Sequence, residues 1–523
     1  MTHQMRAVHP ARRKMLGLLG AGLLSSGMAS AQSVVSWRPA PGVTVGKPIA
    51  LSRQRLDALA GEFFPAFNDG GILPAFSGKI HGARYEVELR ELSTHTTVPE
   101  TGERVEVTGL LAVPVGVKGR IPVVSWHHGT ILSFDQVPSN LIRLADPSYR
   151  VSDAGDSLET LFNLQRLAGQ GFAVIGADYL GKGALRNGRG EAYAVRDATV
   201  QTCCDMLDAG TNGLRQMGLQ SSALFLNGWS QGGLNTQLVH QALRRRGVKI
   251  TASAAQSPFN NLAESLRYWT GQLPIADASR YPAVPNWVSL CIIVVLGSYR
   301  EYYRLPTLFE TAIKPKYQQF AETYWQQYAL SEDDIATAPT SADLLVDGFL
   351  DRFTAAPNSH FLEQVGRNCS TFHTYDSPFR FYYGLADEAL HPSMMHLALA
   401  TAGPHSDSVA VPGASHRGTF LASLYGEGDI AAHRGNVPTW FGSFTRGKGV
   451  RTLCFVGWLK WASFSGVRVL VASIRGPDDG RSTPPNSLDR TDFRARPTRP
   501  AVRCVRRTGG ERGNGHHPGL GNS

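Results

Sequence analysis

The sequence predicts an α/β protein with a mostly parallel sheet and helices packed on both of its faces. Apolar segments alternate along the chain with segments of helical character, and most of these apolar segments are continuous runs. In a parallel sheet, the helices that connect the strands cover both faces of the sheet. Strands that are buried in this way are continuous apolar runs. The chain has 523 residues with 42% hydrophobic and 18% charged content, which suffices for a large core and excludes an intrinsically disordered protein.

The elements are expected in the following order. Residues 85–89 and 105–114 alternate between apolar and polar side chains, as in half-buried antiparallel strands that begin a sheet. Apolar strands are expected over 121–126, 172–178, 223–227, 250–255, 379–384 and 408–412. Helices are expected over 157–169, 198–217 and 394–402. Together these segments form βαβ units and therefore a mostly parallel sheet.

The alternation stops within residues 259–350, which are rich in aromatic residues and helix formers. We expect this segment to be a helical cap inserted between two strands of the sheet, and to influence which substrates enter. The core then consists of residues 32–258 and 351–445. The apolar run 288–297 is too short to span a bilayer and predicts a buried helix or strand.

The first 31 residues predict a signal peptide. The basic residues Arg12, Arg13 and Lys14 precede a short apolar run, and Ala29-Ser30-Ala31 supplies the small residues that a signal peptidase requires. The paired arginines resemble the twin-arginine export motif. A membrane anchor is the alternative, but the run falls short of the ~20 apolar residues that span a bilayer. We therefore expect a secreted or periplasmic protein without stable membrane insertion.

The net charge of +10 is concentrated at the C-terminal end of the chain. Residues 446–523 carry 15 Lys and Arg against 5 Asp and Glu, whereas residues 33–445 carry 33 basic against 37 acidic side chains. The body therefore gives no electrostatic reason to expect nucleic acid as a partner. We expect the Pro- and Gly-rich tail 446–523 to be disordered and dispensable. A basic arm for anionic surfaces, or an out-of-frame extension, would each explain it.

Cysteine and histidine spacing predicts no metal or cofactor. No C-x-x-C pair occurs, and the adjacent His127 and His128 would point in opposite directions from an extended chain. An exported protein can form disulfides, and Cys369 is the candidate partner for Cys203 or Cys204, with the connectivity left open. The other cysteine of the body is Cys291.

The candidate nucleophile is Ser230, within Gly228-Trp229-Ser230-Gln231-Gly232. A G-x-S-x-G match alone is weak evidence in a chain with 55 glycines. Here, however, it follows an apolar strand directly and opens a helical stretch. A sharp turn between a strand and a helix exposes a serine hydroxyl, and the helix N-terminus favours the negative charge that develops there.

A serine nucleophile needs a base, and the base needs an orienting acid. Asp387 lies in the loop after the expected strand 379–384, and His416 lies in the loop after 408–412. This order of serine, acid and histidine predicts a triad, with the neighbouring Glu388 as the alternative acid. A helix cap for Asp387 and a surface-loop position for His416 are the structural alternatives.

Acyl transfer creates an oxyanion, which needs two backbone N–H donors. We expect the amide of Gln231, directly after the nucleophile, to be one donor. The amide of Thr130, which follows His127-His128-Gly129 at the end of a strand, is expected to be the other. Asp178 also ends a strand, and we expect it to fix a loop beside the site rather than to act in catalysis.

These segments together resemble the secretory lipase-like α/β-hydrolases, which are exported lipases and esterases with a helical cap. The resemblance extends over about residues 50–440 and rests on the His-His-Gly-Thr loop, the segment around Asp178, the Ser230 turn and the late Asp387 and His416. It implies hydrolysis of carboxylic esters through an acyl-enzyme. The acyl-chain length and the natural substrate, lipid or polymeric, are left open. A serine peptidase on the same fold and a non-catalytic binding protein remain alternatives, and the oligomeric state is left open.

Overall fold

The computed structural model describes residues 42–275, 281–329, 337–351, 359–427 and 435–445, together with the backbone of 459–464 and 467–472. The chain divides into two compact units, Met1–Val450 and Arg451–Ser523. The expected signal peptide, 1–31, lies outside the described residues.

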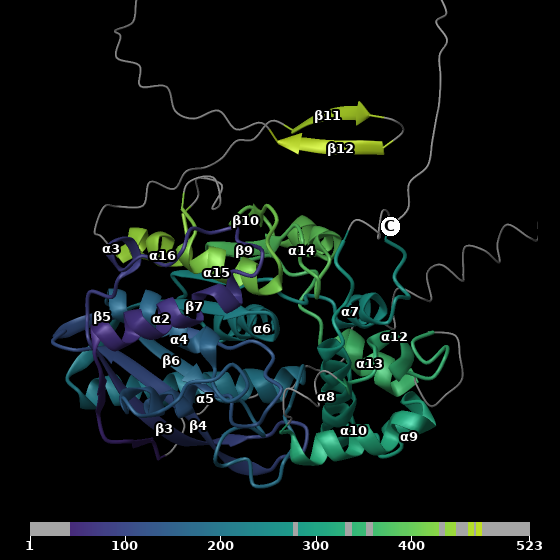
Figure 1. Cartoon of the computed structure of the whole chain (residues 1–523), viewed down its shortest axis with the longest axis horizontal. Helices are drawn as coiled ribbons and strands as arrows, with labels where there is room; N and C mark the ends of the chain where they lie inside the picture. The colour runs from purple at the N-terminus through teal and green to yellow at the C-terminus, as the bar shows by residue number, and fades with distance from the viewer. Residues whose placement is uncertain are drawn as a thin grey trace, which may run out of the picture. The chain divides into compact units, whose positions relative to one another are not determined.

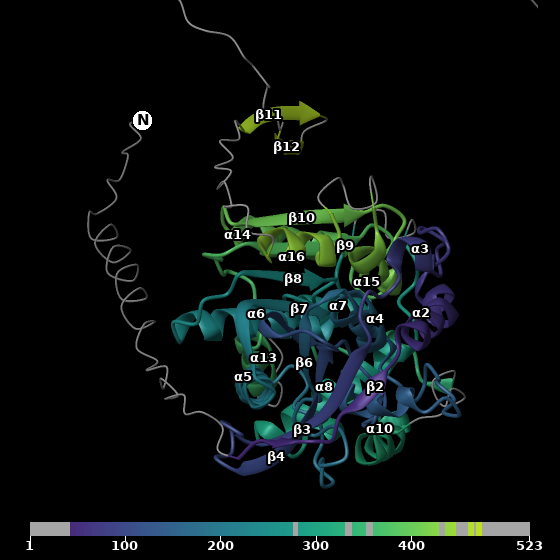
Figure 2. The ribbon, with the colours of Figure 1, turned by 90° about the vertical axis from the view of Figure 1, so that its left-hand side faces the viewer.

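One ten-stranded sheet forms the centre of the first unit (Figures 1 and 2). Its order is β1-β3-β4-β6-β5-β7-β8-β9-β10, with β2 paired to β3. The strands are β1 (Thr44–Val45), β2 (Ile49–Leu51), β3 (Val87–Thr97), β4 (Arg104–Pro114), β5 (Gly119–His127), β6 (Ala173–Ala177), β7 (Leu219–Trp229), β8 (Ala252–Gln256), β9 (Phe379–Gly384) and β10 (Ser406–Val411). In this order, the neighbouring strands β6, β5, β7, β8, β9 and β10 pair in parallel. The pairs among β1, β2, β3 and β4 are antiparallel. The predicted mostly parallel sheet is confirmed.

Helices cover both faces of this sheet, as the continuous apolar strands predict. Successive residues of β5 point to opposite faces, so that Val123 joins one apolar core and Val124 the other. The first core includes α5 (Arg196–Gln216) and α6 (Gln231–Arg245). The second includes α2 (Arg53–Phe67), α4 (Leu158–Arg166), α15 (His416–Tyr425) and α16 (Val437–Thr445). Each fully buried aliphatic side chain contributes about 1.5–3 kcal/mol to folding.

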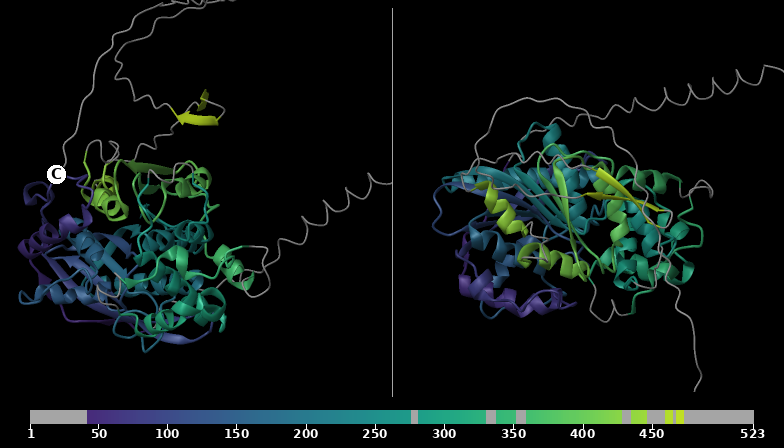
Figure 3. Two further views of the ribbon diagram at one scale, coloured as in Figure 1. Left: turned by 45° about the vertical axis from the view of Figure 1, so that its right-hand side comes forward. Right: turned by 90° about the horizontal axis from the view of Figure 1, so that it is seen from above.

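A group of helices separates β8 from β9 in the chain, and the views in Figures 1 and 3 show it gathered at one side of the sheet. The longest of them, α8, contains the apolar run 288–297 and is buried almost all round, which is typical of a core helix. The group comprises α7 (Leu262–Trp269), α8 (Trp287–Tyr302), α9 (Leu308–Ala312), α10 (Pro315–Gln327), α12 (Ser341–Leu344) and α13 (Ser359–Arg367). We call these helices the cap.

The other described helices of the first unit are short: α3 (Gly78–His81), α14 (Met395–Thr401), and the 3₁₀ helices η1 (Pro138–Ala145), η2 (Ala168–Gln170) and η4 (Pro392–Met394). Across the described segments, no helix has the length and apolar character to cross a bilayer. In the second unit, β11 (Leu459–Phe464) pairs antiparallel with β12 (Val467–Ala472). The rest of the expected tail, 446–523, lies outside the described residues.

Cys203, Cys204, Cys291 and Cys369 are all free thiols, so the disulfide candidate between Cys369 and Cys203 or Cys204 is not formed. The reason is local: Cys203 and Cys204 are buried on α5, whereas the Cys369 thiol contacts Asn261 Oδ1 and the Val365 carbonyl.

Candidate active site

Ser230 lies at the turn between β7 and α6, with φ 56° and ψ −118°. A left-handed backbone conformation is rare for a serine and costs about 1–3 kcal/mol unless the surroundings impose it. Here two glycines allow it. A Cβ at Gly228 would lie 2.1 Å from the Gly232 carbonyl oxygen, and one at Gly232 would lie 1.9 Å from the His127 carbonyl oxygen. The spacing of the motif is therefore a steric requirement of this turn.

The Ser230 amide donates a hydrogen bond to the Gln256 carbonyl at 2.8 Å, which anchors the turn to the end of β8. Ser230 is only 7% exposed and lies at the N-terminus of the 15-residue helix α6. The dipole of that helix favours negative charge beside the serine. The turn therefore presents the hydroxyl at the carboxyl end of the strands, where α/β proteins bind their ligands.

His416 and Asp387 form a buried pair. The loop after β9 carries Asp387, and His416 is the first residue of α15, after β10. The imidazole Nδ1 lies 3.1 and 3.0 Å from the two carboxylate oxygens of Asp387. Asp387 Oδ1 also accepts hydrogen bonds from the amides of Ala389 and Leu390, at 3.0 and 2.8 Å. These amides hold the carboxylate in one orientation.

Burial disfavours the charged imidazole, but the charge of Asp387 and the hydrogen bond to it outweigh burial and raise the pKa of His416. The Asp387 carboxylate thus fixes both the orientation of the ring and its proton affinity. Glu388, the alternative acid, instead accepts a hydrogen bond from the His416 backbone amide at 2.9 Å. Trp229 packs against the imidazole, with ring centroids 5.0 Å apart.

Ser230 and His416 line the same cavity, which has a volume of about 500 Å³. Its wall combines aromatic and aliphatic side chains with five carboxylates and one arginine. The lining residues are Ala66, Phe67, Asp69, Thr130, Ile131, Leu132, Ser133, Gln136, Asp153, Ala154, Asp156, Glu159, Trp229, Ser230, Trp287, Glu388, His416 and Arg417. Trp287 is the first residue of α8, so the cap contributes directly to this cavity.

The two residues expected to supply the oxyanion donors border the site: Gln231 directly follows Ser230, and Thr130 lines the same cavity as Ser230. Gln231 is the first residue of α6, and its side-chain amide donates to Glu191 Oε1 at 2.6 Å. Thr130 lines the cavity, and its hydroxyl lies 2.6 Å from the Tyr193 hydroxyl. The structure thus brings all five sequence-predicted site residues together.

His127 and His128 are buried parts of the scaffold. Burial lowers the pKa of His127 to about 3 and that of His128 to about 4, so both rings are neutral at pH 7. The His127 ring lies 2.7 Å from the Thr236 hydroxyl, and His128 stacks on Tyr179 with centroids 4.0 Å apart. Among the described residues, no group of three or more His, Cys, Asp or Glu side chains could hold a metal ion.

Asp178 anchors a loop next to the site. Its carboxylate accepts hydrogen bonds from Thr108 Oγ1 at 2.6 Å and from both the amide and the hydroxyl of Ser139, at 2.9 and 2.5 Å. Burial raises the pKa of Asp178 to about 6, although these hydrogen bonds oppose the shift.

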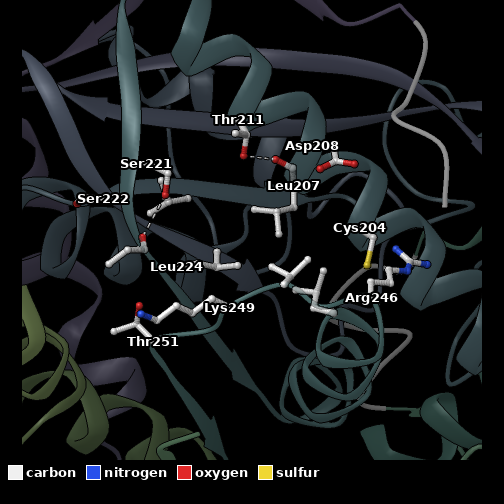
Figure 4. Close-up of a pocket in the computed structure, with 14 residues that line it drawn as sticks. Cys204, Leu207, Asp208, Thr211, Ser221, Ser222, Leu224, Arg246, Lys249 and Thr251 are labelled. Carbon is white, nitrogen blue, oxygen red and sulfur yellow. Dashed lines mark hydrogen bonds between the residues drawn. The ribbon is translucent and has the colours of Figure 1, made fainter.

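A second cavity, of about 400 Å³, lies at the opposite end of β7 (Figure 4). Its wall includes Ser221 and Leu224 near the start of that strand, Cys204 from α5, and Arg246, which directly follows α6. None of the five site residues lines it. The cavity with Ser230 is therefore the candidate active site.

Sequence analysis did not identify Lys182, Glu191 and Tyr328, which form a buried polar cluster next to Gln231. No motif marks them, since Gln231 and Tyr328 lie far along the chain from Glu191. The only available signal was weak: Lys182 and Glu191 are charged residues in the Gly-rich segment that follows a buried strand, and Arg186 and Arg189 of the same segment share that property.

The fold resembles solved structures of hydrolases. The esterase LipA from Xanthomonas oryzae, described as rice cell wall degrading, aligns with a TM-score of 0.56 at 19% identity over 73% of this chain and 94% of its own. A putative hydrolase from Legionella pneumophila aligns with a TM-score of 0.61 at 16% identity over 79% and 99%. No family model and no curated protein sequence matches the chain. These likenesses establish an α/β-hydrolase fold.

Proposed function

We propose that this chain is an exported serine hydrolase that cleaves carboxylic esters through an acyl-enzyme intermediate. One observation carries the proposal: Ser230, in a left-handed turn, opens onto the same cavity as His416, whose Nδ1 is held 3.0 Å from Asp387. This geometry supports Ser230 as nucleophile, His416 as base and Asp387 as orienting acid, and the α/β-hydrolase fold supports the same chemistry.

In the first half-reaction, Ser230 Oγ attacks the ester carbonyl carbon while its proton passes to His416 Nε2. Asp387 accepts the hydrogen bond from Nδ1 and stabilises the imidazolium. The tetrahedral intermediate collapses, the C–O bond breaks, and the leaving alcohol takes the proton from Nε2. In the second half-reaction, His416 removes a proton from water, which attacks the acyl-enzyme. The acid is released and Ser230 regains its proton.

The oxyanion of each tetrahedral intermediate needs donors that are already in place. The Gln231 amide, at the N-terminus of α6, and the Thr130 amide, on the cavity wall, are the proposed pair. The α6 dipole adds to their stabilisation of negative charge. Removal of one such donor typically lowers kcat by about 10²–10³.

The cavity supports an ester substrate of moderate size. Trp229, Trp287 and Phe67 supply apolar surface for an acyl group, while the carboxylates and Arg417 suit a polar alcohol portion. LipA, the structural neighbour, is described as a rice cell wall degrading esterase. A lipid or a polymeric ester therefore remains the proposed natural substrate class for this chain.

Export is part of the proposal, on the evidence of residues 1–31 alone. The mature protein is expected to begin at Gln32, after Ala29-Ser30-Ala31. Expression of the full chain in a bacterium followed by fractionation and intact-mass measurement tests this. Recovery of the uncleaved chain from the cytoplasm alone would contradict it.

A p-nitrophenyl ester series from acetate to palmitate tests the reaction class, with peptide p-nitroanilides as the comparison. We expect ester hydrolysis across part of the series and no anilide hydrolysis. Efficient anilide hydrolysis would indicate a serine peptidase instead. A chain that hydrolyses neither, and that a fluorophosphonate does not label, would be a non-catalytic binding protein.

A further inference from the structure

A fully buried ion pair lies behind the proposed oxyanion donors. Lys182 Nζ is 2.9 Å from Glu191 Oε2, and both side chains have no exposed surface. A buried ion pair seldom increases stability over a well-packed apolar pair, because the desolvation of two charges offsets their attraction. Because the pair lies next to a candidate active site, we asked which site residues it holds in position.

The pair joins the catalytic turn to the cap. Glu191 Oε1 accepts from the Gln231 side-chain amide at 2.6 Å, while Glu191 Oε2 accepts from the hydroxyl of Tyr328, the residue that directly follows the cap helix α10. Lys182 Nζ donates to the same hydroxyl. We call Lys182, Glu191, Gln231 and Tyr328 the Glu191 cluster. Its members come from the β6–α5 loop, the catalytic turn and the cap.

The same cluster holds the loop that carries Thr130. The Tyr328 hydroxyl lies 3.2 Å from the Ile131 carbonyl oxygen, and Lys182 Nζ lies 3.5 Å from it. The Tyr328 carbonyl accepts from the Phe134 amide at 2.8 Å. Ile131 and Phe134, two residues of the loop that carries Thr130, are therefore both bonded to Tyr328.

A second connection reaches Thr130 itself. Its hydroxyl lies 2.6 Å from the Tyr193 hydroxyl, and the Tyr193 amide donates to Ser298 Oγ of α8 at 3.1 Å. Ser298 Oγ also lies 2.5 Å from the Glu191 carbonyl oxygen. Gln231 is thus linked to the cap through charge-assisted hydrogen bonds to Glu191, and Thr130 is linked to it through hydroxyl hydrogen bonds.

From these contacts we infer that the cap completes the oxyanion hole: the Glu191 cluster fixes the Gln231 and Thr130 amides, with Tyr328 as the cap's positioning residue. The inference rests on the proposed serine-hydrolase function. A cap that only selected substrates would affect binding, whereas a cap that positions oxyanion donors affects the chemical step for every ester, the smallest included. Tyr328 touches no reacting atom and acts through Glu191 and Ile131.

The test compares Tyr328→Phe with Tyr303→Phe. Both remove one phenol oxygen from the cap, but Tyr303 contacts Asn368, outside the Glu191 cluster. We expect Tyr328→Phe to lower kcat for p-nitrophenyl acetate, and the rate of fluorophosphonate labelling of Ser230, by about tenfold or more, with KM nearly unchanged. Tyr303→Phe should leave both rates within about twofold. Equal effects of the two variants would overturn the inference.

A double-mutant cycle tests independently whether Tyr328 and Gln231 act through the same cluster. Gln231→Met keeps the backbone amide but removes the bond to Glu191. If both variants act through one cluster, Tyr328→Phe combined with Gln231→Met should lose little more than the larger single loss. Additive losses would contradict the inference. Should Tyr328→Phe fail to fold, Ser298→Ala takes its place in the same cycle, with the same expected non-additivity.

The labelling rate separates the two proposals. A wild-type chain whose Ser230 reacts with neither a fluorophosphonate nor an ester refutes the serine-hydrolase function, and the role of the Glu191 cluster with it. A reactive Ser230 whose labelling rate is insensitive to Tyr328→Phe refutes only the inference about the cap.

Discussion

At the scale of single residues, the proton affinity of His416 determines when the proposed base can act. Burial favours the neutral ring, while the charge of Asp387, the hydrogen bond to it and the charge of Glu388 favour the protonated ring; the net effect raises the pKa of His416 above 6.5. Only the neutral imidazole can accept the Ser230 proton. Activity should therefore fall as the pH drops through a value above 6.5.

We predict that the acid limb of kcat/KM against pH has its midpoint above 6.5. Glu388→Gln should move this midpoint to lower pH and keep most of the activity, because it removes one charge that raises the pKa but leaves an acceptor for the His416 amide. Asp387→Asn should lower kcat by roughly 10⁴, since a neutral amide does not stabilise the imidazolium and its NH2 group favours the wrong tautomer of the ring. The measurement is a set of pH–rate profiles with p-nitrophenyl acetate.

Two results would count against this account. An acid limb at or below pH 6.5 in the wild type would show that Asp387 does not raise the pKa of the base. A loss in Glu388→Gln as large as that in Asp387→Asn would make Glu388 the acid, as the sequence alone allowed.

At the scale of elements, the turn between β7 and α6 depends on close backbone approach. Gly232 has no room for a side chain, since a Cβ there meets the carbonyl oxygens of both His127 and His128 at 1.9 and 2.5 Å. Both contacts are to backbone, which cannot move without displacing the end of β5. The turn and the His-His-Gly-Thr loop therefore fit together as one unit.

We predict that Gly232→Ala lowers kcat/KM by about 10²-fold or prevents folding, because it forces apart the Gln231 and Thr130 segments. The matched control is Gly366→Ala on α13, where nothing lies within 4 Å of the added Cβ and φ is not positive. Thermal unfolding and ester hydrolysis measure the two outcomes. Near-normal activity in Gly232→Ala would contradict the described turn.

The sequence predicted these elements where the signal is local. Continuous apolar runs marked the parallel strands, the spacing of Gly228 and Gly232 marked the turn, and chain order selected Asp387 and His416. The Glu191 cluster escaped because its contacts join residues far apart in the chain, such as Gln231 with Glu191 and Glu191 with Tyr328. The sequence predicted that the inserted segment is helical. It did not predict that Trp287 lines the cavity, because that position depends on the packing of residues far apart in the chain.

At the scale of the whole molecule, the chain consists of two units, and the first contains every residue of the proposed site. The last described helix of that unit, α16, seals the second core, with Phe441 stacked on Phe225 at 4.5 Å between centroids. Catalysis should therefore not depend on the second unit.

We predict that truncation after Arg446 leaves ester hydrolysis and thermal unfolding of the first unit essentially unchanged. Truncation after Glu427 is the control: it removes α16 and exposes Phe225, and burial of one such aromatic ring is worth about 3 kcal/mol or more. This shorter chain should unfold at lower temperature. Loss of specific activity on a soluble ester after truncation at Arg446 would instead make the tail part of the enzyme.

The central claim is that Ser230 is the nucleophile of an ester hydrolase, and one paired measurement tests it most directly. Wild type and Ser230→Ala are treated with a fluorophosphonate, the labelled peptide is identified by mass spectrometry, and hydrolysis of p-nitrophenyl acetate is followed in parallel. We predict labelling of wild type at Ser230, no labelling of the variant, and a loss of about 10⁴–10⁶ in kcat with unchanged thermal unfolding. Ester hydrolysis near the wild-type rate in Ser230→Ala would contradict the claim.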